Sequence, residues 1–190
     1  MEMQYARPEL RGVPVGSASI ARSSLYMVAD IPSRHERIIM ADETLTLTLD
    51  SGGDVVIKLR PDLAPGHVAR IVENAKEGFY DGVVFHRVIP GFMAQGGDPT
   101  GTGMGGHPEK SDLKAEFSRE PHVRGVCSMA RASNPNSANS QFFICFDDAT
   151  FLDGQYTVWG EVTSGMEYVD ALPKGEPPRM PGKIVKATVA

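Results

Sequence analysis

The sequence predicts a mainly β fold, a closed eight-stranded antiparallel barrel capped by two α-helices. The segment Thr44–Leu49 alternates polar and apolar residues without a break, which is typical of a half-buried strand. Seven further short segments are apolar or alternating, whereas only two segments have the spacing of an amphipathic helix. Because so many strands would otherwise leave exposed sheet edges, we expect the sheet to close on itself, with the helices as caps.

Length and charge limit the classes of function. The chain has 190 residues, which is enough for one domain with a hydrophobic core. Its formal net charge of −5 at pH 7 argues against a general nucleic-acid binder, and no apolar run is long enough to span a membrane. We therefore expect neither nucleic acid nor a membrane as a partner. A compact closed barrel also gives no reason to associate, so we expect a monomer.

Residues 1–39 differ in composition from the rest of the chain. They contain five arginines and no lysine, with scattered Pro, Gly and Ser, and they show no sustained period of 2 or 3.6. Acidic residues interrupt any signal-like or transit-like pattern, which favours the cytoplasm. We expect a poorly ordered N-terminal extension over 1–39 and a folded domain over 40–190 that begins near Met40.

The folded part is expected to begin with a β-hairpin and a helix. Residues 50–54 supply turn residues between the first strand and the apolar segment Val55–Leu59. A helix is expected over Pro65–Glu77, because proline suits a first helical turn and apolar residues then recur at i, i+3, i+4 and i+7. Gly78 stands where this helix would end.

Six further strands and one short helix complete the expected barrel. The strand segments are rich in β-branched and aromatic residues, and Gly, Pro or Asn residues lie near their ends. The short helix is expected over Met166–Leu172. The strands are expected at 84–89, 92–96, 124–130, 140–146, 156–162 and 183–189.

The metal-binding and thiol residues show no known site spacing. Cys127 and Cys145 lie in apolar segments and form no Cys-x-x-Cys pair, so we interpret them as buried thiols in a reducing compartment. From sequence alone, a disulfide between the two cysteines on neighbouring strands is an alternative. The five histidines show no zinc-binding spacing, and we expect neither a metal nor a cofactor.

Two loops between the predicted strands have distinctive compositions. Gly101–Gly106 formally matches the dinucleotide-binding fingerprint, but His107-Pro108 follows it where a helix would have to meet the phosphates. We interpret these glycines as a tight loop that allows close backbone approach. The polar loop Arg131–Asn139 is longer than a usual hairpin connection, and loops of this kind often line a site.

The stretch Val84–Asp98 carries the most informative side chains. Alternation places Arg87 on a face with apolar neighbours, and a Pro-Gly pair then ends the strand. In the next extended run Gln95 can face the same surface, beside Phe92 and Met93. Spacing alone leaves two interpretations open: a polar group set in an apolar pocket, or a solvated strand arginine above ordinary core residues, with the second favoured.

The motif Phe85–Asp98, followed by Ser140–Ile144 and Phe151–Gly154, resembles the cyclophilin family of peptidyl-prolyl cis-trans isomerases. The likeness extends in the family's order from about Glu43 to Ala190. It implies an eight-stranded barrel closed by two helices. It also implies an enzyme that rotates X-Pro bonds in proline-containing polypeptides and assists their folding.

The resemblance also implies roles for individual residues. Arg87 takes the position of the catalytic arginine, with Gln95 beside it and Phe92 in the wall of the proline pocket. Further residues would line that pocket or meet the substrate backbone. They are Met93, Gly101, Ala130, Arg131, Gln141, Phe143, Phe151, Leu152 and Tyr156.

The chain departs from many eukaryotic members of the family at three positions. Phe151 stands in place of tryptophan, and because an indole N–H donor is lost we expect at most weak cyclosporin binding. Tyr156 replaces histidine and keeps an aromatic wall with a polar tip. Arg131 replaces asparagine, and we expect it to add a preference for acidic substrate residues.

Two other classes of function stay open. A non-catalytic module could use the same pocket to bind proline-containing segments as a chaperone. Arg87 beside Gln95 argues against this class, because simple binding does not need that pair. A hydrolase has little support, since the sequence has no Gly-x-Ser-x-Gly motif, no paired carboxylates and no metal spacing.

Overall fold

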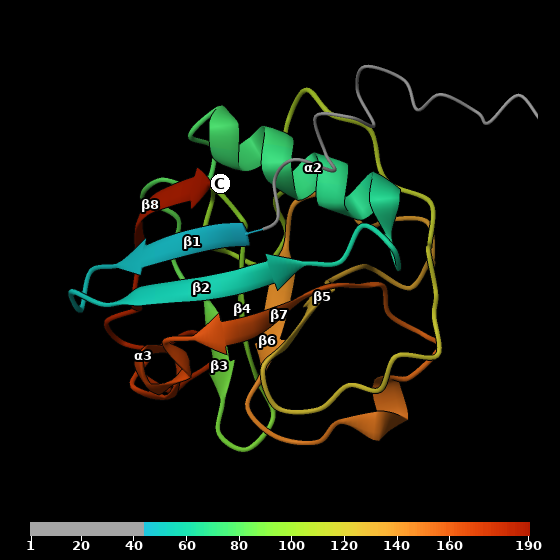
Figure 1. Ribbon diagram of the computed structural model, residues 1–190. Helices are drawn as coiled ribbons and strands as arrows, with labels where there is room; N and C mark the ends of the chain where they lie inside the picture. The colour runs from blue at the N-terminus through green and yellow to red at the C-terminus, as the bar shows by residue number, and fades with distance from the viewer. Residues whose placement is uncertain (1–43) are drawn as a thin grey trace, which may run out of the picture. The chain divides into compact units, whose positions relative to one another are not determined.

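The computed structural model describes residues 44–190, which form one curled antiparallel sheet with helices packed against it (Figure 1). The predicted extension over residues 1–39 lies outside the described residues. The eight strands follow the order β3-β4-β6-β5-β7-β2-β1-β8 in the sheet. Their bounds are β1 Thr44–Leu49, β2 Asp54–Leu59, β3 Arg87–Ile89, β4 Met93–Gly96, β5 Val126–Met129, β6 Phe142–Cys145, β7 Val158–Ser164 and β8 Ile184–Val189.

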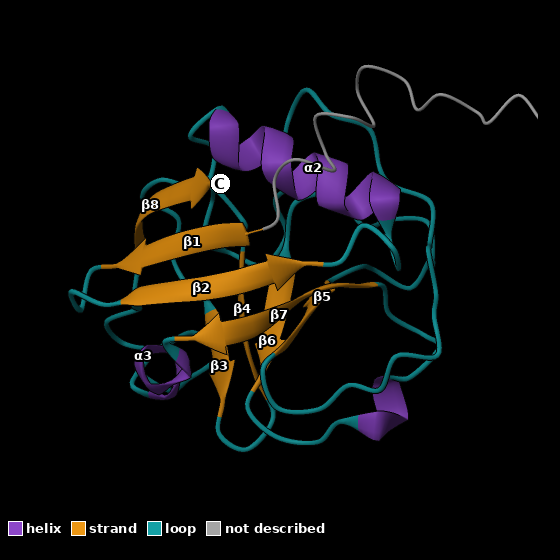
Figure 2. Cartoon of the chain, viewed as in Figure 1, coloured by secondary structure: helices purple, strands orange, loops and turns teal. Residues whose placement is uncertain are grey.

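Both predicted helices are confirmed (Figure 2). Helix α2 covers Pro65–Lys76, with proline in its first turn, and helix α3 covers Met166–Asp170. A short 3-10 helix, η1, covers Thr150–Leu152. None of the helices within residues 44–190 has the length and apolar character needed to cross a bilayer.

The sheet is open, so the predicted closure of the barrel is wrong. Its two end strands, β3 and β8, are not paired with each other. The chain beside them makes only isolated bridges, Val84 with Lys183 and Val88 with Gly175. Four prolines in residues 173–181 explain this, because a proline has no N–H to donate to a continuous ladder. The strands therefore form a curled half-barrel.

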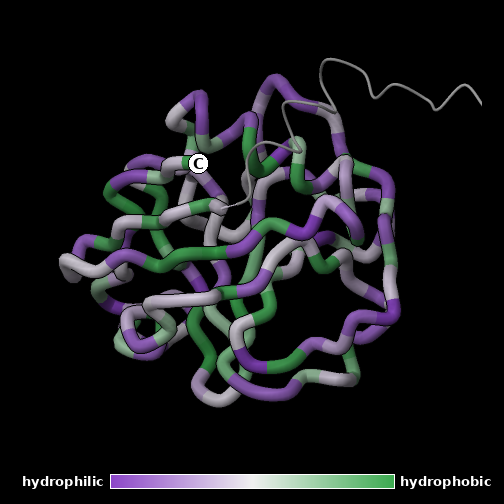
Figure 3. Tube along the Cα trace, in the orientation of Figure 1, coloured by the Kyte–Doolittle hydropathy of each residue, from purple (hydrophilic) through white to green (hydrophobic). Residues whose placement is uncertain are grey.

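The main core fills the inside of the curl, and Figure 3 shows hydrophobic residues along the strands with hydrophilic residues in the surrounding loops. Strand β6 is buried on both faces. Phe142 and Ile144 point into the main core, whereas Phe143 and Cys145 belong to a second, smaller apolar cluster. The second cluster lies on the outer face of the sheet and contains the candidate site.

The N-terminus of α2 is capped by a residue from a distant part of the chain. Ala64 at the N-cap position offers no side-chain acceptor. Instead, the Glu116 carboxylate accepts the backbone N–H groups of Gly66 at 3.1 Å and of His67 at 3.0 Å. A carboxylate at this end of a helix also interacts favourably with the helix dipole. Glu116 therefore fixes α2 to the segment that precedes β5.

The two cysteines are free and buried, as predicted. Cys127 lies in the main core and Cys145 in the second cluster, on opposite faces of the sheet. Burial raises the pKa of the Cys145 thiol to about 12, and burial also raises that of Cys127. Neither thiol is therefore ionised, and thus reactive, near neutral pH.

Candidate active site

A small pocket opens over β4 and β6 on the outer face of the sheet. Its volume is about 130 Å³. Nine of the twelve predicted site residues line it: Arg87, Phe92, Met93, Gln95, Ala130, Arg131, Phe143, Leu152 and Tyr156.

Strand register explains why these side chains converge. Arg87 on β3 is paired with Gln95 on β4, and Gln95 is paired with Phe143 on β6. Residues directly opposite one another in antiparallel strands point to the same face, and β3, β4 and β6 are neighbouring strands in the sheet (Figure 1), so the three side chains form a row across them. The structure therefore places Arg87 at the border of an apolar pocket, with 41% of its side chain exposed.

The pocket walls are aromatic and aliphatic. Met93, Phe143 and Leu152 are almost completely buried. The Tyr156 ring meets Phe143 edge-on, with the ring centroids 5.7 Å apart. The recess therefore offers an apolar surface to a small ring, with a guanidinium at its edge.

Below the pocket, a buried histidine supports Phe143. The rings of His122 and Phe143 stack with centroids 6.2 Å apart. The Nδ1 atom of His122 lies 2.9 Å from Asp153 Oδ1, and its Nε2 atom lies 3.1 Å from Ser128 Oγ. Sequence reasoning missed this support, because no motif links residues so far apart in the chain.

Ser128, His122 and Asp153 are the three residue types of a hydrolase triad, but the first two are not accessible to a substrate. Ser128 and His122 are completely buried. The Ser128 hydroxyl donates to the Thr157 carbonyl at 2.8 Å, so it is engaged within the fold. A nucleophile must reach its substrate, and this arrangement therefore acts as a structural support.

A chain of hydrogen bonds fixes the two site amides. Gln95 Nε2 donates to Gln141 Oε1 at 2.9 Å. Gln141 Nε2 in turn donates to the carbonyls of Gly103 at 3.0 Å and of Gly105 at 2.7 Å. The Gln95 amide therefore has a defined orientation, with its own carbonyl oxygen left as an acceptor.

The glycine-rich loop wraps around the buried carboxylate of Asp98. This carboxylate accepts the backbone N–H groups of Thr100 at 2.8 Å, Gly103 at 2.7 Å and Gly105 at 3.1 Å. Burial alone would raise the pKa of Asp98, but these bonds and the one from the Thr100 hydroxyl outweigh it and lower the pKa to about 2. N–H groups that a bound phosphate would need are therefore occupied, which agrees with the tight-loop interpretation.

A larger recess of about 540 Å³ adjoins the pocket and shares Gln95, Ala130 and Arg131 with it. Gln141 also lines this recess. Gly101, by contrast, lines neither space, and Phe151 lies at the rim, 64% exposed, with its ring 5.5 Å from that of Phe92. The structure thus gathers most of the predicted residues and leaves these two outside the pocket lining.

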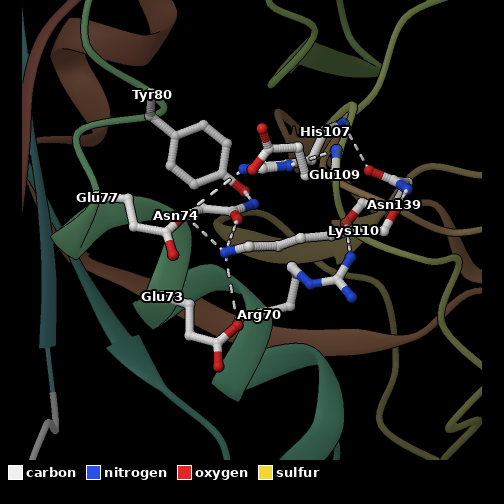
Figure 4. Close-up of polar contacts among 9 residues, drawn as sticks. All are labelled: Arg70, Glu73, Asn74, Glu77, Tyr80, His107, Glu109, Lys110 and Asn139. Atoms are coloured by element: carbon white, nitrogen blue, oxygen red, sulfur yellow. Dashed lines mark hydrogen bonds and ion pairs between the residues drawn. The ribbon is translucent and has the colours of Figure 1, made fainter.

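A polar network ties the outer wall of the larger recess to α2 (Figure 4). Lys110 Nζ donates to Glu77 Oε2 at 2.8 Å and to Asn74 Oδ1 at 3.1 Å. Arg70 Nη2 donates to the Ser111 carbonyl at 2.9 Å. Asn139 connects the same wall to the start of β6, because its Nδ2 donates to the Lys110 carbonyl at 3.0 Å. The helix therefore holds this wall in place.

The Arg131 side chain packs against neighbouring residues at the protein surface. Its guanidinium carbon lies 4.6 Å from the centroid of the Tyr156 ring. Its Nε and Nη2 atoms donate to the Gln155 carbonyl at 3.1 and 3.0 Å, and Nη1 donates to the Ala132 carbonyl at 2.9 Å. These contacts fix Tyr156 as a wall of the pocket.

The chain is similar in sequence to known peptidyl-prolyl cis-trans isomerases. The family model described as cyclophilin type peptidyl-prolyl cis-trans isomerase/CLD matches residues 44–189. A probable peptidyl-prolyl cis-trans isomerase of Brucella suis is 54% identical, over 78% of this chain and 83% of the relative. Peptidyl-prolyl cis-trans isomerase B of Bacillus subtilis is 44% identical, over 67% of this chain and 89% of the relative.

Solved structures give the same result. Cyclophilin AquaCyp293 from Hirschia baltica has a TM-score of 0.71 and 32% identity, covering 77% of this chain and 73% of that chain. A cyclophilin type peptidyl-prolyl cis-trans isomerase of Cryptosporidium parvum, crystallised in the presence of the dipeptide Ala-Pro, has a TM-score of 0.71 and 29% identity. The alignment with it covers 77% of this chain and 98% of that chain.

Proposed function

This chain belongs to the cyclophilin-type peptidyl-prolyl cis-trans isomerases, and on that premise we propose that Arg87 catalyses rotation about X-Pro bonds held over the apolar pocket. The observation that carries the proposal is the row formed by Arg87, Gln95 and Phe143, which sets a permanent cation beside a recess for a small ring. The substrates are proline-containing polypeptides, and the role is to assist their folding.

The chemical task is to weaken the resonance of one amide bond. Rotation of a peptide bond has a barrier of about 18–20 kcal/mol, because the nitrogen lone pair is delocalised into the carbonyl. In the twisted state the nitrogen regains that lone pair, and the Arg87 guanidinium can donate a hydrogen bond to it. Only the twisted state gains fully from this contact, as rate acceleration requires.

The apolar residues of the pocket have two tasks. Phe92, Met93, Phe143 and Leu152 hold the proline ring, so that the chain on one side of the bond can turn against a fixed group. They also exclude water from the reacting amide, which strengthens the contact with Arg87. Gln95, oriented by Gln141, offers a carbonyl oxygen next to the same bond.

The magnitudes are consistent with this mechanism. Uncatalysed isomerisation takes about 10–100 s, so turnover in milliseconds needs roughly 10⁴- to 10⁵-fold acceleration, or about 5.5–7 kcal/mol. A charge-assisted hydrogen bond in a site that excludes water, together with fixation of the ring, can supply a contribution of this order. Bound substrate completes the exclusion of water around the half-exposed Arg87.

Four residues would meet the substrate backbone or the residues that flank proline. Ala130, Arg131 and Gln141 line the larger recess beside the pocket, where the chain on one side of the proline can extend. Gly101 would contribute through its backbone. The proposal includes a preference of Arg131 for acidic substrate residues. The N–H groups of Arg131 also donate to backbone carbonyls, which hold its guanidinium in place beside the recess.

The assay that tests the function is protease-coupled isomerisation of a prolyl peptide. We expect the wild-type chain to accelerate the cis-to-trans step in proportion to its concentration. A non-catalytic binding module would bind the same peptide without changing this rate, and that result would contradict the proposal. Refolding of a protein limited by proline isomerisation tests the folding role in the same way.

We expect kcat/KM to stay nearly constant between about pH 6 and pH 9, because an arginine side chain stays charged throughout this range. His86 is the neighbouring group that could transfer a proton. Burial lowers the pKa of His86, which favours the neutral ring, and in the described part of the chain its ring nitrogens have no hydrogen-bond partner. A bell-shaped pH–rate profile with two near-neutral limbs would instead indicate proton transfer.

We expect Phe151→Trp to tighten cyclosporin binding by about tenfold, because one added hydrogen bond contributes about 1–1.5 kcal/mol. Phe151 lies exposed at the pocket rim, so an indole there can point its N–H toward a bound ligand. Titration calorimetry measures the affinity. Phe151→Leu serves as the control without a donor, and equal affinities of all three proteins would contradict the assignment.

A further inference from the structure

We propose that Glu176 is a positioning residue that orients the Arg87 guanidinium toward the pocket, an inference that rests on the proposed role of Arg87. Glu176 lies outside every pocket wall described above, in the proline-containing segment between α3 and β8. The Arg87 Nε atom lies 3.3 Å from Glu176 Oε2.

The backbone brings Glu176 to this place. Gly175 and Val88 exchange two hydrogen bonds, from Val88 N–H to the Gly175 carbonyl at 2.8 Å and from Gly175 N–H to the Val88 carbonyl at 2.9 Å. In this antiparallel bridge the residue after Gly175 is opposite the residue before Val88. Glu176 is therefore the cross-strand neighbour of Arg87.

Glycine at position 175 is required by the backbone path of this segment. Its φ is +147°, a backbone conformation that residues other than glycine rarely adopt. A Cβ atom at this position would lie 2.8 Å from Pro178 Cα and 2.9 Å from the Pro177 carbonyl oxygen. Glycine at this position therefore permits the turn between the bridge to Val88 and the Pro177-Pro178 pair, and Glu176 lies within that turn.

The ion pair with Glu176 determines which N–H donors of Arg87 remain available to the substrate. A guanidinium has N–H donors at Nε and at two terminal nitrogens, all in one plane. Glu176 engages Nε, and within residues 44–190 the terminal nitrogens of Arg87 have no hydrogen-bond acceptor. Fixing Nε therefore aims the terminal N–H groups while leaving them free for the prolyl amide.

The strength of this pair suits a positioning role and not a stabilising one. Both side chains are about half exposed, and exposed ion pairs contribute little to the stability of a fold. Catalysis is more sensitive, because it depends on the orientation of a flexible arginine at an end strand of three residues. We therefore expect an effect on kcat without an effect on unfolding.

The test compares Glu176→Ala and Glu176→Gln with the wild-type chain on an uncharged prolyl peptide. We expect Glu176→Ala to lower kcat by about threefold to fivefold, the size of one cross-strand charge pair. KM and the urea midpoint of unfolding should stay unchanged. Glu176→Gln should recover part of the loss, because its amide oxygen still accepts the Nε–H. Glu161→Ala, which removes an exposed glutamate on β7, is the matched control.

The dependence of kcat on ionic strength provides a second test. A purely structural role of Glu176 would not produce such a dependence. Salt screens exposed charge pairs, so wild-type kcat should fall toward that of Glu176→Ala between about 10 mM and 1 M salt, whereas Glu176→Ala should respond little. In an Arg87→Ala background, which removes the partner of Glu176, Glu176→Ala should have no further effect on the residual rate. Unchanged or increased kcat in Glu176→Ala would overturn the inference, whereas full activity of Arg87→Ala would overturn the proposed function itself.

Discussion

Arg87→Ala is expected to lower kcat/KM by about 10²- to 10³-fold, the range found when one preorganised donor is removed from an active site. The loss should lie mainly in kcat, because Arg87 stabilises the twisted amide, whereas the apolar walls that bind the proline ring are unchanged. The free energy of unfolding should change by less than about 1 kcal/mol, because the side chain is half exposed at an end strand.

Two variants control this experiment. Arg87→Lys keeps the charge but replaces the planar fork with a single ammonium group, and we expect it to recover only a small part of the activity. Arg119→Ala removes an exposed arginine that lines neither recess, and its activity should equal that of the wild type. Urea unfolding of each variant separates lost chemistry from lost structure. An Arg87→Ala protein with full activity would contradict the assignment.

Asp98→Asn is expected to lower the free energy of unfolding at pH 7 by about 2–3 kcal/mol, because the change affects a fully buried carboxylate. The new amide would place N–H donors against the backbone N–H groups of the glycine-rich loop, which the carboxylate now accepts. Activity should also fall, since the carbonyls of Gly103 and Gly105 in that loop orient Gln141.

The pH dependence of stability provides an independent test of the same group. The pKa of Asp98 is about 2 in the folded protein, below the value of 3.8 that the free side chain has. The stabilisation is therefore complete above about pH 4 and is lost as the pH falls toward 2, an effect of about 2 kcal/mol.

Urea unfolding of the wild type at pH 4 and at pH 2 should show this decrease. Asp98→Asn should lack this part of the pH dependence. Asp148→Asn, at an exposed aspartate, should retain it. A wild-type protein and an Asp98→Asn variant with the same pH dependence would contradict the assignment.

Local patterns in the sequence predicted most of the elements and placed Arg87 and Gln95 on one face, whereas the resemblance to a family supplied the remaining pocket residues. The alternation of Thr44–Leu49 reports which face of β1 is buried, and the structure buries each leucine of this strand. The period of two around Arg87 places this residue on a common face with Gln95, which the register of β3 and β4 bears out. Such features depend on residues close together in the chain, so sequence contains them directly.

Contacts between distant segments could not be predicted in the same way. The open sheet depends on where residues 173–181 lie beside β3, and the number of strands does not specify that position. The ion pair of Arg87 with Glu176 depends on the same placement. Asp98 was visible only as the last residue of a motif, because the backbone N–H groups that surround its carboxylate come from a loop whose path no periodicity describes.

The external cap on α2 has a consequence for biosynthesis. The carboxylate that covers the first N–H groups of this helix comes from Glu116, about fifty residues later in the chain. A ribosome completes residues 65–76 well before it adds that glutamate, so the nascent helix must begin with its leading amides open to water. The order of synthesis thus delays the final docking of α2 until the middle of the polypeptide has emerged.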